Sequence, residues 1–209
     1  ALKLADTFCN ADANAKVLIV CTELCSIHFQ KENNEDNMLA NALFADGSAA
    51  LLVEATPCKG LNLKPESFFC DLASSSENEM AWTVGDLGFE MRLTSYVPEI
   101  IRTGINQLTT SLLNRISKNL SDVSYFAIHP GGKKILEVIE QELGITKEQN
   151  HASYEVLKNY GNMSSPTVLF VLNEVCKNLN GVDGGKNILS FGFGPGLTLE
   201  SMLLKIENH

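Results

Sequence analysis

The sequence lacks the charge and the apolar runs that mark several large classes of protein. Sixteen lysines and arginines stand against 25 aspartates and glutamates, which gives a net charge of −9. Because nucleic acids and anionic membrane surfaces bind basic surfaces, neither is an expected partner. No apolar run approaches the roughly 20 residues of a membrane-spanning helix, and the first residues lack the basic segment of a signal peptide. A membrane span is therefore not expected.

Motifs that bind metals, nucleotides or phosphates are also missing. No group of histidines and cysteines has the spacing of metal ligands. Gly181-Val-Asp-Gly-Gly-Lys186 is not a P-loop, because Asn187 stands where a magnesium-binding Ser or Thr is needed. Gly192-Phe-Gly-Pro-Gly196 is not a dinucleotide fingerprint, because Leu197 replaces the third glycine and a strand is expected to follow. Neither a metal nor a permanently bound cofactor is predicted.

Paired cysteines are absent as well. The six cysteines are scattered and no CxxC pair occurs among them: Cys9, Cys21, Cys25, Cys58, Cys70 and Cys176. Disulfides persist in oxidising compartments, whereas unpaired cysteines behave as small apolar residues. The cysteines therefore predict a reduced, cytoplasmic protein whose thiols are mostly buried.

What the sequence does contain is a regular alternation of apolar patterns. Apolar residues make up 44% of the 209 positions, enough for a substantial core in one large or two small domains. The patterns predict strands alternating with helices, and hence an α/β fold with helices on a mixed sheet. The expected helices are Ala1–Phe8, Met38–Phe44, Pro98–Ile116, Lys133–Leu143, Tyr154–Tyr160 and Pro166–Leu179. The expected strands are Lys16–Glu23, Ala49–Ala55, Met80–Val84, Phe89–Leu93, Ser124–His129, Asn187–Phe193 and Leu197–Leu204.

Three segments carry more specific expectations. Lys16–Glu23 is almost continuously apolar, as in a strand buried on both faces. Thr56–Glu79 contains Pro57, Gly60, Pro65 and a run of serines, which predicts a linker with room for one strand inside it. Ala1–Phe8 places Leu4, Ala5 and Phe8 on one helix face but has neither an initiator Met nor a capping residue before it. The chain is therefore expected to be a fragment of a longer protein.

His129 is a candidate catalytic residue because of its position. It ends an apolar strand and precedes Pro130, which favours extended backbone, while Gly131 and Gly132 allow a sharp turn into the next helix. In α/β sheets, ligands bind at the carboxyl ends of strands, where helices begin. The alternative is a buried histidine with a purely structural role.

Asn162 has a comparable setting. It lies in the loop that leads into a helix, with Ser165 as the expected N-cap and Pro166 as the first helical residue. Its amide can donate to a ligand in the same cavity as His129, and a His and Asn donor pair is what acyl transfer needs to hold an oxyanion. The alternative is an asparagine that satisfies its own turn. No matching nucleophile is evident in the chain.

Four segments together closely resemble the type III polyketide synthases, the chalcone synthase-like branch of the thiolase fold. They are Leu43-Phe-Ala-Asp-Gly47, Ile128-His-Pro-Gly-Gly132, Tyr160-Gly-Asn-Met-Ser-Ser165 and Gly192-Phe-Gly-Pro-Gly-Leu-Thr198. Their order and spacing also fit, and the resemblance covers essentially the whole chain. It implies a thiolase-like fold in which residues 1–55 are a remnant of the N-terminal half and residues 56–209 form the C-terminal half.

The resemblance also implies a reaction. In this family a cysteine thiolate takes an acyl group from coenzyme A, and decarboxylation of malonyl-coenzyme A supplies the carbanion that extends it. His129 would match the histidine that keeps the cysteine ionised and helps hold the thioester oxygen. Asn162 would match its partner in binding that oxygen and stabilising the enolate. Phe44 would match the aromatic gate between the coenzyme A tunnel and the cavity, the alternative being ordinary core packing. A homodimer is expected for the full-length protein.

The chain departs from the family pattern in two ways. The family's nucleophilic cysteine would fall before Ala1, so this chain is expected to carry half an active site and to be inactive alone. Cys25 and His28 stand where plant chalcone synthases line the cavity with two threonines, whereas Gly88 would retain the small residue at the cavity wall. These residues resemble bacterial members more than plant ones. A flavonoid product is therefore disfavoured, and an alkylpyrone, alkylresorcinol or similar aromatic polyketide is an equal candidate.

Two other interpretations stay open. A ketoacyl synthase III or a hydroxymethylglutaryl synthase shares the fold and the cysteine chemistry, although Leu43–Gly47 and Gly192–Gly196 fit those enzymes less well. A chain without the nucleophilic half could instead be a noncatalytic scaffold or dimerisation partner. The starter acyl group, the number of malonyl extensions and the mode of cyclisation depend on the shape of the cavity and are not predicted.

Overall fold

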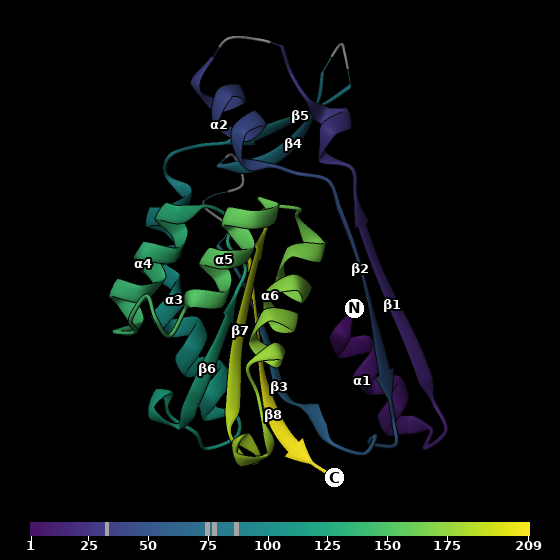
Figure 1. The fold of residues 1–209 in the computed structure, drawn as a ribbon. Helices are drawn as coiled ribbons and strands as arrows, with labels where there is room; N and C mark the ends of the chain where they lie inside the picture. Colours follow the sequence, from purple (N-terminus) through teal and green to yellow (C-terminus); the bar gives the residue numbers. More distant parts are fainter. Residues whose placement is uncertain (32–33, 74–75, 77–78, 86–87) are drawn as a thin grey trace.

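A four-stranded mixed sheet forms the centre of the molecule (Figure 1). The computed structural model describes all residues except 32–33, 74–75, 77–78 and 86–87. The strand order is β3-β8-β7-β6. β6 (Val123–Ile128) and β7 (Asn187–Gly194) are parallel, whereas β8 (Thr198–Asn208) is antiparallel to both β7 and β3 (Leu61–Leu72). The predicted mixed sheet is confirmed.

Helices cover both faces of this sheet. α3 (Val97–Asn114) packs on β3 and β8, and α4 (Lys133–Leu143) packs against α3. α5 (His151–Tyr160) and α6 (Ser165–Lys177) contact β6 from the other side (Figure 1). Short 3-10 turns at Leu120–Asp122 and Gly181–Asp183 precede β6 and β7.

The core is divided by the sheet into two clusters. Successive side chains of a strand point to opposite faces. Leu189 and Leu203 accordingly pack in the cluster with α3 and α4, whereas their neighbours Ile188 and Leu204 pack in the cluster with α6. This two-sided burial explains why the segments of β7 and β8 are almost continuously apolar.

A second sheet is a long two-stranded ribbon. β1 (Lys16–Glu23) pairs antiparallel with β2 (Gly47–Glu54), so the predicted pairing of these segments is confirmed. α1 (Leu2–Ala11) and α6 pack against the ribbon. α6 therefore lies between the ribbon and the central sheet (Figure 1).

The prediction that β1 is buried on both faces is wrong. Ile19 is 8% exposed, but Leu18 and Val20 on the other face are 63% and 61% exposed. Within the described residues, helices cover one face of the ribbon, so alternate side chains of β1 stay open to solvent. α1 shows the same mismatch, because Leu4 and Phe8 are exposed while Ala5 is buried.

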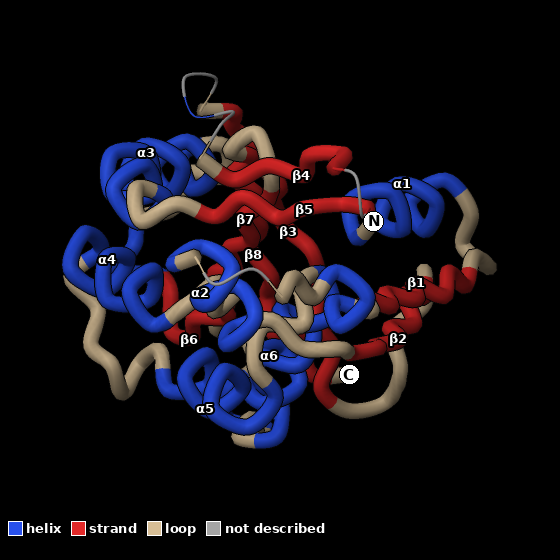
Figure 2. Tube along the Cα trace, turned by 90° about the horizontal axis from the view of Figure 1, so that it is seen from above, coloured by secondary structure: helices blue, strands red, loops and turns tan. Residues whose placement is uncertain are grey.

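A cap sits over the upper end of the central sheet, and Figure 2 views it from above. It consists of the 3-10 turn η1 (Cys25–His28), α2 (Glu35–Leu43) and the antiparallel hairpin of β4 (Met80–Gly85) and β5 (Gly88–Leu93). β5 contacts both α2 and η1. The cap brings residues from the first half of the chain over the ends of β6 and β7.

Element boundaries agree with the sequence prediction to within a few residues, with one exception. α2 and α5 each begin three residues early, and for α2 the reason is that the Asn34 side chain accepts the Asn37 N–H. Thr56–Glu79 contains the one strand that the prediction allowed, but β3 occupies twelve of its residues, so the segment is not mainly a linker. Pro65 is tolerated in β3 because it lies at a register shift on an edge strand.

All six cysteines are free, but the prediction of mostly buried thiols is wrong. Cys58 and Cys70 are exposed and the other four are half-buried. The reason is local: Cys58 lies in the turn after β2, and Cys70 lies on the edge strand β3. Among the helices that the structure describes, none combines the length and the apolar character needed to cross a membrane.

Candidate active site

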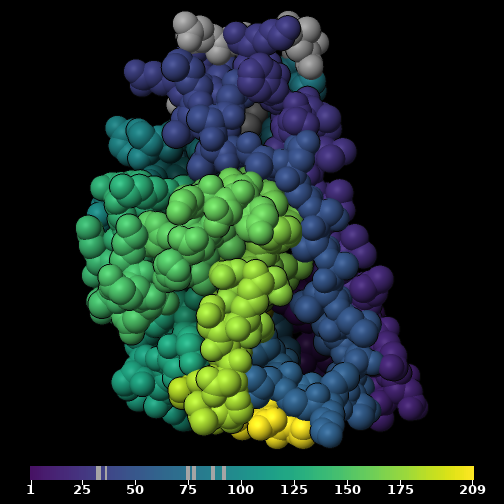
Figure 3. Space-filling view, viewed as in Figure 1, coloured from purple at the N-terminus to yellow at the C-terminus, as the bar shows by residue number. Residues whose placement is uncertain are grey.

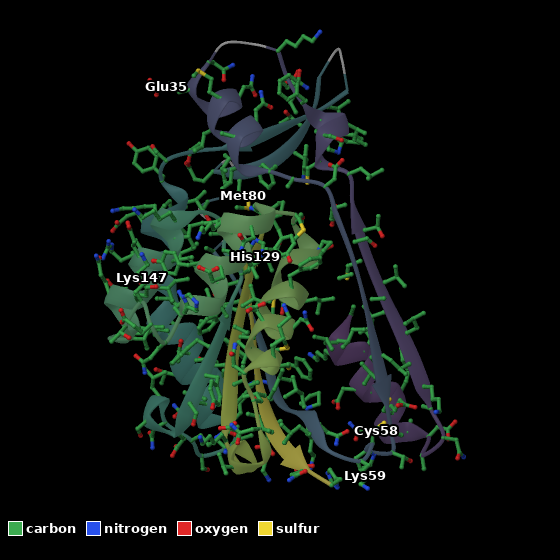
Figure 4. The ribbon with its side chains drawn as sticks, in the orientation of Figure 1. Glu35, Cys58, Lys59, Met80, His129 and Lys147 are labelled. Carbon is green, nitrogen blue, oxygen red and sulfur yellow. The ribbon has the colours of Figure 1, made fainter. Side chains whose placement is uncertain are left out.

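Three segments that are distant in the sequence meet above the carboxyl ends of β6 and β7. They are the turn after β6, the loop between α5 and α6, and the segment that joins α2 to β2. Figure 4 labels His129 in this region, between the central sheet and the cap. The segments are three of the four that carry the family resemblance.

His129 ends β6 as predicted. Its backbone N–H donates to Phe191 O at 2.9 Å, which extends the parallel ladder by one residue. The side chain is 8% exposed, and no hydrogen bond to its imidazole is present among the described residues. Burial lowers the pKa of His129 to about 4, so the imidazole is neutral at neutral pH. A neutral imidazole keeps one N–H that can donate to a ligand oxygen.

Asn162 reaches toward the His129 turn. Its Nδ2 donates to Gly131 O at 3.4 Å, and its Oδ1 accepts the Ser164 N–H at 2.9 Å. The second bond is the local turn contact that the structural interpretation expected. The first is not local, because it crosses to the residue two positions after His129. The two loops are thus joined by a hydrogen bond, and Asn162 is 4% exposed. That the side chains of His129 and Asn162 face one cavity stays a prediction.

Phe44 lies directly beside Asn162. The two residues form an isolated parallel bridge, in which Asn162 N–H donates to Leu43 O and Ala45 N–H donates to Asn162 O, each at 2.9 Å. Gly161 makes this approach possible. Its φ is +71°, and a Cβ there would lie 3.1 Å from Ala45 Cβ and 3.2 Å from Leu43 O.

A cavity of about 470 Å³ opens on the other side of this bridge. It is lined by the end of β1 and η1, by α2, by the Phe44–Asp46 segment, by Trp82 and by Ser164. Cys25, His28 and Phe44 are thus brought together around one cavity, and their role in binding the substrate stays a prediction. His129 and Asn162 do not line this cavity. Ser164, in the same loop as Asn162, does line it.

Hydrogen bonds hold the walls of the cavity in place. The Asp46 carboxylate accepts the Ser26 N–H and the Ser26 hydroxyl, each at 2.7 Å, and these bonds lower the pKa of Asp46. Glu23 accepts a hydrogen bond of 2.6 Å from the Ser165 hydroxyl. The first pair fixes the turn that carries Cys25, and the second ties the end of β1 to the start of α6.

Cys25 does not have the properties of a nucleophile. Burial, together with the carboxylates of Glu23 and Asp46, raises the pKa of its thiol. Because the thiolate is the reactive form, a raised pKa makes this side chain inert at neutral pH. Its place in the wall is that of a small, weakly polar lining residue.

Gly88 lies outside the cavity lining, and Trp82 lines it instead. Gly88 has φ +119° opposite Gly85 in the hairpin, and a Cβ there would meet nothing within 4 Å. This backbone conformation by itself accounts for the glycine. Trp82 packs against His28 in a tilted arrangement, with ring centroids 4.6 Å apart and an interplanar angle of 56°. Trp82 was not among the predicted lining residues, because strand alternation does not tell which face of the hairpin meets the cavity.

In the described part of the chain, no three His, Cys, Asp or Glu side chains lie close enough together to hold a metal ion. The chemistry that these residues offer is hydrogen-bond donation from His129 and Asn162 beside an aromatic cavity. That arrangement suits the stabilisation of an oxyanion.

Two family models match the chain. The model for chalcone and stilbene synthases, C-terminal domain, matches residues 68–207. The model for 3-oxoacyl-[acyl-carrier-protein (ACP)] synthase III matches residues 1–71. The two matches overlap inside β3. The predicted boundary between residues 55 and 56 is tested by neither and stays a prediction.

Similar proteins agree with these matches. The chain is 34% identical over 98% of its length to probable polyketide synthase 1 of Dictyostelium discoideum, covering 7% of that protein. It is 33% identical over 99% of its length to the alpha-pyrone synthesis polyketide synthase-like Pks18 of Mycobacterium tuberculosis, covering 53% of it. The chain thus spans about half the length of the mycobacterial relative.

Solved structures share the fold. The 1,3,6,8-tetrahydroxynaphthalene synthase of Streptomyces coelicolor, a bacterial type III polyketide synthase, superposes with a TM-score of 0.91 at 30% identity. The match covers 100% of this chain and 59% of that one. PKS-I from the brown alga Ectocarpus siliculosus gives a TM-score of 0.88 at 31% identity, covering 97% of this chain and 56% of that one.

Proposed function

Because this chain belongs to the chalcone and stilbene synthase family, we propose that it is the C-terminal part of a type III polyketide synthase. The whole enzyme condenses an acyl-coenzyme A starter with malonyl-coenzyme A. The observation that carries the proposal is the hydrogen bond from Asn162 to Gly131 O, which joins the Asn162 loop to the His129 turn. Two buried donors on joined loops suit a site that must bind a thioester oxygen without rearranging.

The reaction has two steps in which these donors act. A cysteine thiolate attacks the starter thioester, forms a new carbon–sulfur bond and releases coenzyme A as its thiolate. Malonyl-coenzyme A then loses carbon dioxide, and the electron pair of the broken carbon–carbon bond forms an enolate. That enolate attacks the acyl-enzyme and displaces the cysteine thiolate. His129 and Asn162 donate to the thioester oxygen on which the negative charge develops.

The nucleophile comes from outside this chain in our proposal. The pKa values of Cys25, Cys58, Cys70 and Cys176 are all raised, chiefly by burial or, for Cys58, by its hydrogen bond to Glu54. A thiolate placed beside His129 would raise the pKa of the imidazole, since opposite charges stabilise each other. The ion pair of the cysteine thiolate and the protonated His129 imidazole would then supply the ionised cysteine that the reaction needs.

Exposed apolar side chains on the ribbon and on α1 support the proposal that another part of the full-length protein packs there. Leu18, Val20 and Leu52 are exposed on β1 and β2, and Leu4 and Phe8 are exposed on α1. A groove of about 980 Å³ also runs between the ribbon and the β3–α6 side of the molecule (Figure 3). We assign residues 1–55 to the N-terminal thiolase-like half, whose remaining part would cover these surfaces.

Several further features follow from the same proposal. Coenzyme A thioesters are the substrates, and the full-length enzyme needs no permanently bound cofactor. It acts as a homodimer in the cytoplasm. An alkylpyrone, alkylresorcinol or similar aromatic polyketide is an equal candidate for the product, because Cys25 and His28 line the cavity and stand where plant chalcone synthases have threonines.

A second candidate is a ketoacyl synthase III-like enzyme, which the match of residues 1–71 favours. The two candidates differ in the carrier of the malonyl group, since that family is named for acyl-carrier-protein thioesters. Comparing malonyl-coenzyme A with malonyl-acyl-carrier protein as the extender therefore separates them.

The test is to incubate the 209-residue chain and the full-length protein with a fatty acyl-coenzyme A and labelled malonyl-coenzyme A, followed by chromatography. The full-length protein should form labelled polyketide and the chain alone should form none. Cys176→Ser in the full-length protein is the control and should leave the product unchanged. Product from the chain alone would show that the nucleophile has been misplaced.

A further inference from the structure

Ser153 makes a buried hydrogen bond to the residue before His129. Its hydroxyl donates to Ile128 O at 2.7 Å, and both residues are fully buried. A serine inside a helix ordinarily donates to a carbonyl of its own preceding turn. Ser153 lies in the first turn of α5 and donates to strand β6 instead. The bond therefore joins two elements and holds the peptide group that leads into His129.

The Ile128 carbonyl needs this partner because of its place in the sheet. β6 is an edge strand of the four-stranded sheet, and backbone groups on the open side of an edge strand have no ladder partner. A buried carbonyl without a hydrogen bond is costly. The next residue is held from the other side, since the His129 N–H donates to Phe191 O of β7 at 2.9 Å. The end of β6 is thus fixed on both sides where the His129 turn begins.

The start of α5 is itself fixed to α4 on both sides of Ser153. Asn150 Nδ2 donates to Glu140 Oε1 at 2.9 Å, and the Tyr154 hydroxyl donates to Glu140 Oε2 at 3.2 Å. α4 begins at Lys133, directly after the His129 turn. The helix turn that carries Ser153 is therefore tied to the helix that follows His129, and it has little freedom to move relative to that histidine.

The far end of α5 holds the same turn a second time. Asn162, two residues after α5 ends, donates to Gly131 O. His129 thus lies between two carbonyls, those of Ile128 and Gly131, that α5 and the loop after it both contact. Because no hydrogen bond to the imidazole is present among the described residues, the backbone of the turn largely sets where the ring points.

We propose that Ser153 is a positioning residue for His129, and that its hydrogen bond to Ile128 O sets the place of the imidazole. Ser153 acts through the backbone and contacts neither substrate nor nucleophile. Donors that stabilise a developing charge work because they are already in place, and a small displacement of such a group lowers the rate strongly. The effect of Ser153 on catalysis rests on the proposed function, whereas its effect on the His129 side chain does not.

The titration of His129 tests this placement without any reaction. Nuclear magnetic resonance of the chain with isotope-labelled histidine follows each imidazole, and the His129 signal is identified by its loss in His129→Gln. In the wild type this signal should stay that of a neutral ring down to about pH 5, because burial lowers the pKa of His129 to about 4. In Ser153→Ala the turn should admit water, and the midpoint should rise by about one pH unit.

Three further variants separate the hydroxyl from a general loss of packing. Ser153→Thr keeps the hydroxyl and should keep the wild-type midpoint. Ser153→Cys fills the site but donates weakly, so it should raise the midpoint by less than Ser153→Ala without leaving a void. Ser67→Ala is the matched control, because the buried Ser67 hydroxyl donates to Leu112 O and lies on β3, at the opposite edge of the sheet. It should leave the His129 signal unchanged.

Circular dichroism establishes that each variant is folded before it is titrated. A wild-type midpoint in both Ser153→Ala and Ser153→Cys overturns the proposal. A midpoint in Ser153→Thr as high as in Ser153→Ala, or an equal rise in Ser67→Ala, also counts against a specific role of this hydroxyl.

The kinetics of the full-length protein supply the second measurement. Ser153→Ala should lower kcat for the decarboxylation of malonyl-coenzyme A roughly tenfold and leave KM within about twofold, because a displaced donor costs rate rather than binding. Ser67→Ala should change neither. A raised KM with an unchanged kcat would contradict a positioning role. A failure of the proposed function would look different: the wild-type protein would release no carbon dioxide, while the His129 midpoint would still depend on Ser153.

Discussion

Phe44 and Asn162 form an isolated parallel bridge although 118 positions separate them in the sequence (162 − 44). Two backbone hydrogen bonds of 2.9 Å, one on each side of Asn162, make the bridge rigid. The side chain of Asn162 then continues the connection to the His129 turn through Gly131 O. Phe44, Asn162 and the His129 turn are therefore parts of one hydrogen-bonded unit. A substitution at one of them should shift the positions of the others.

Replacing Asn162 by Asp should separate its two roles. Aspartate keeps an acceptor for the Ser164 N–H but loses the donor that now reaches Gly131 O. In the full-length protein, Asn162→Asp should lower malonyl-coenzyme A decarboxylation ~10²–10³-fold, the usual effect of losing one oxyanion donor. The measurement is the release of labelled carbon dioxide. Asn159→Ala, an exposed change near the end of α5, is the control. An equal loss in both variants would remove Asn162 from the mechanism.

Because of His129, the stability of the chain should depend on pH in a range above the pKa values of ordinary carboxylates. Its pKa is about 4 in the folded chain, because burial opposes the charged form, and ordinarily about 6.5 when unfolded. The unfolded chain thus binds the extra proton, so stability is complete above pH 6.5 and is lost as pH falls toward 4. Between pH 7.5 and 5 the loss should be about 2 kcal/mol.

Urea unfolding at the two pH values measures this loss. His129→Gln should remove most of the difference, whereas His151→Gln, an exposed change at the start of α5, should leave it in place. If the His129→Gln chain lost as much stability on acidification as the wild type, the titrating group would be a different one.

Gly161→Ala should destabilise the chain more than Gly144→Ala. Gly144 has φ +65° and ψ 30°, so alanine there carries the strain of a left-handed backbone, roughly 1–2 kcal/mol. Gly161 has φ +71° and ψ −166°, a conformation that only glycine adopts readily, so alanine is strained more there by the backbone alone. A Cβ at 144 meets nothing within 4 Å, whereas one at 161 crowds Ala45 and the Leu43 carbonyl. Thermal unfolding should therefore show the larger drop for Gly161→Ala, and equal drops would mean that the bridge yields without cost.

Breaking the hydrogen bonds between Ser26 and Asp46 should make the cavity wall less ordered while leaving the donors His129 and Asn162 in place. Asp46→Asn replaces one of two charge-assisted acceptors by an amide, and Ser26→Ala removes the hydroxyl donor. In the full-length enzyme, the KM for the starter should rise severalfold while kcat stays close to the wild-type value. Ser48→Ala, on the exposed side of β2, is the control. A fall in kcat with an unchanged KM would contradict this positioning role.

Much of this molecule follows from local patterns in the chain. The bounds predicted for the helix at Lys133–Leu143 match α4 residue for residue, because its apolar period begins after two glycines and ends at Gly144. The bend at Gly192–Gly196 likewise turns β7 into β8 as expected. The turn before Pro130 and the loop before Pro166 place His129 and Asn162 at element ends, since proline and glycine restrict the backbone directly.

Other features were decided only by tertiary packing. Residues 16–23 form a strand by their own preference, but which neighbours cover the strand is a property of the assembled fold, and Leu18 and Val20 are left open. Residues 61–72 read as a linker because proline and polar residues interrupt them, yet pairing along β8 makes them a strand. The hairpin sends Trp82 rather than Gly88 to the cavity. Sequence periodicity determines that a strand has two faces; only the contacts made in three dimensions determine what each face meets.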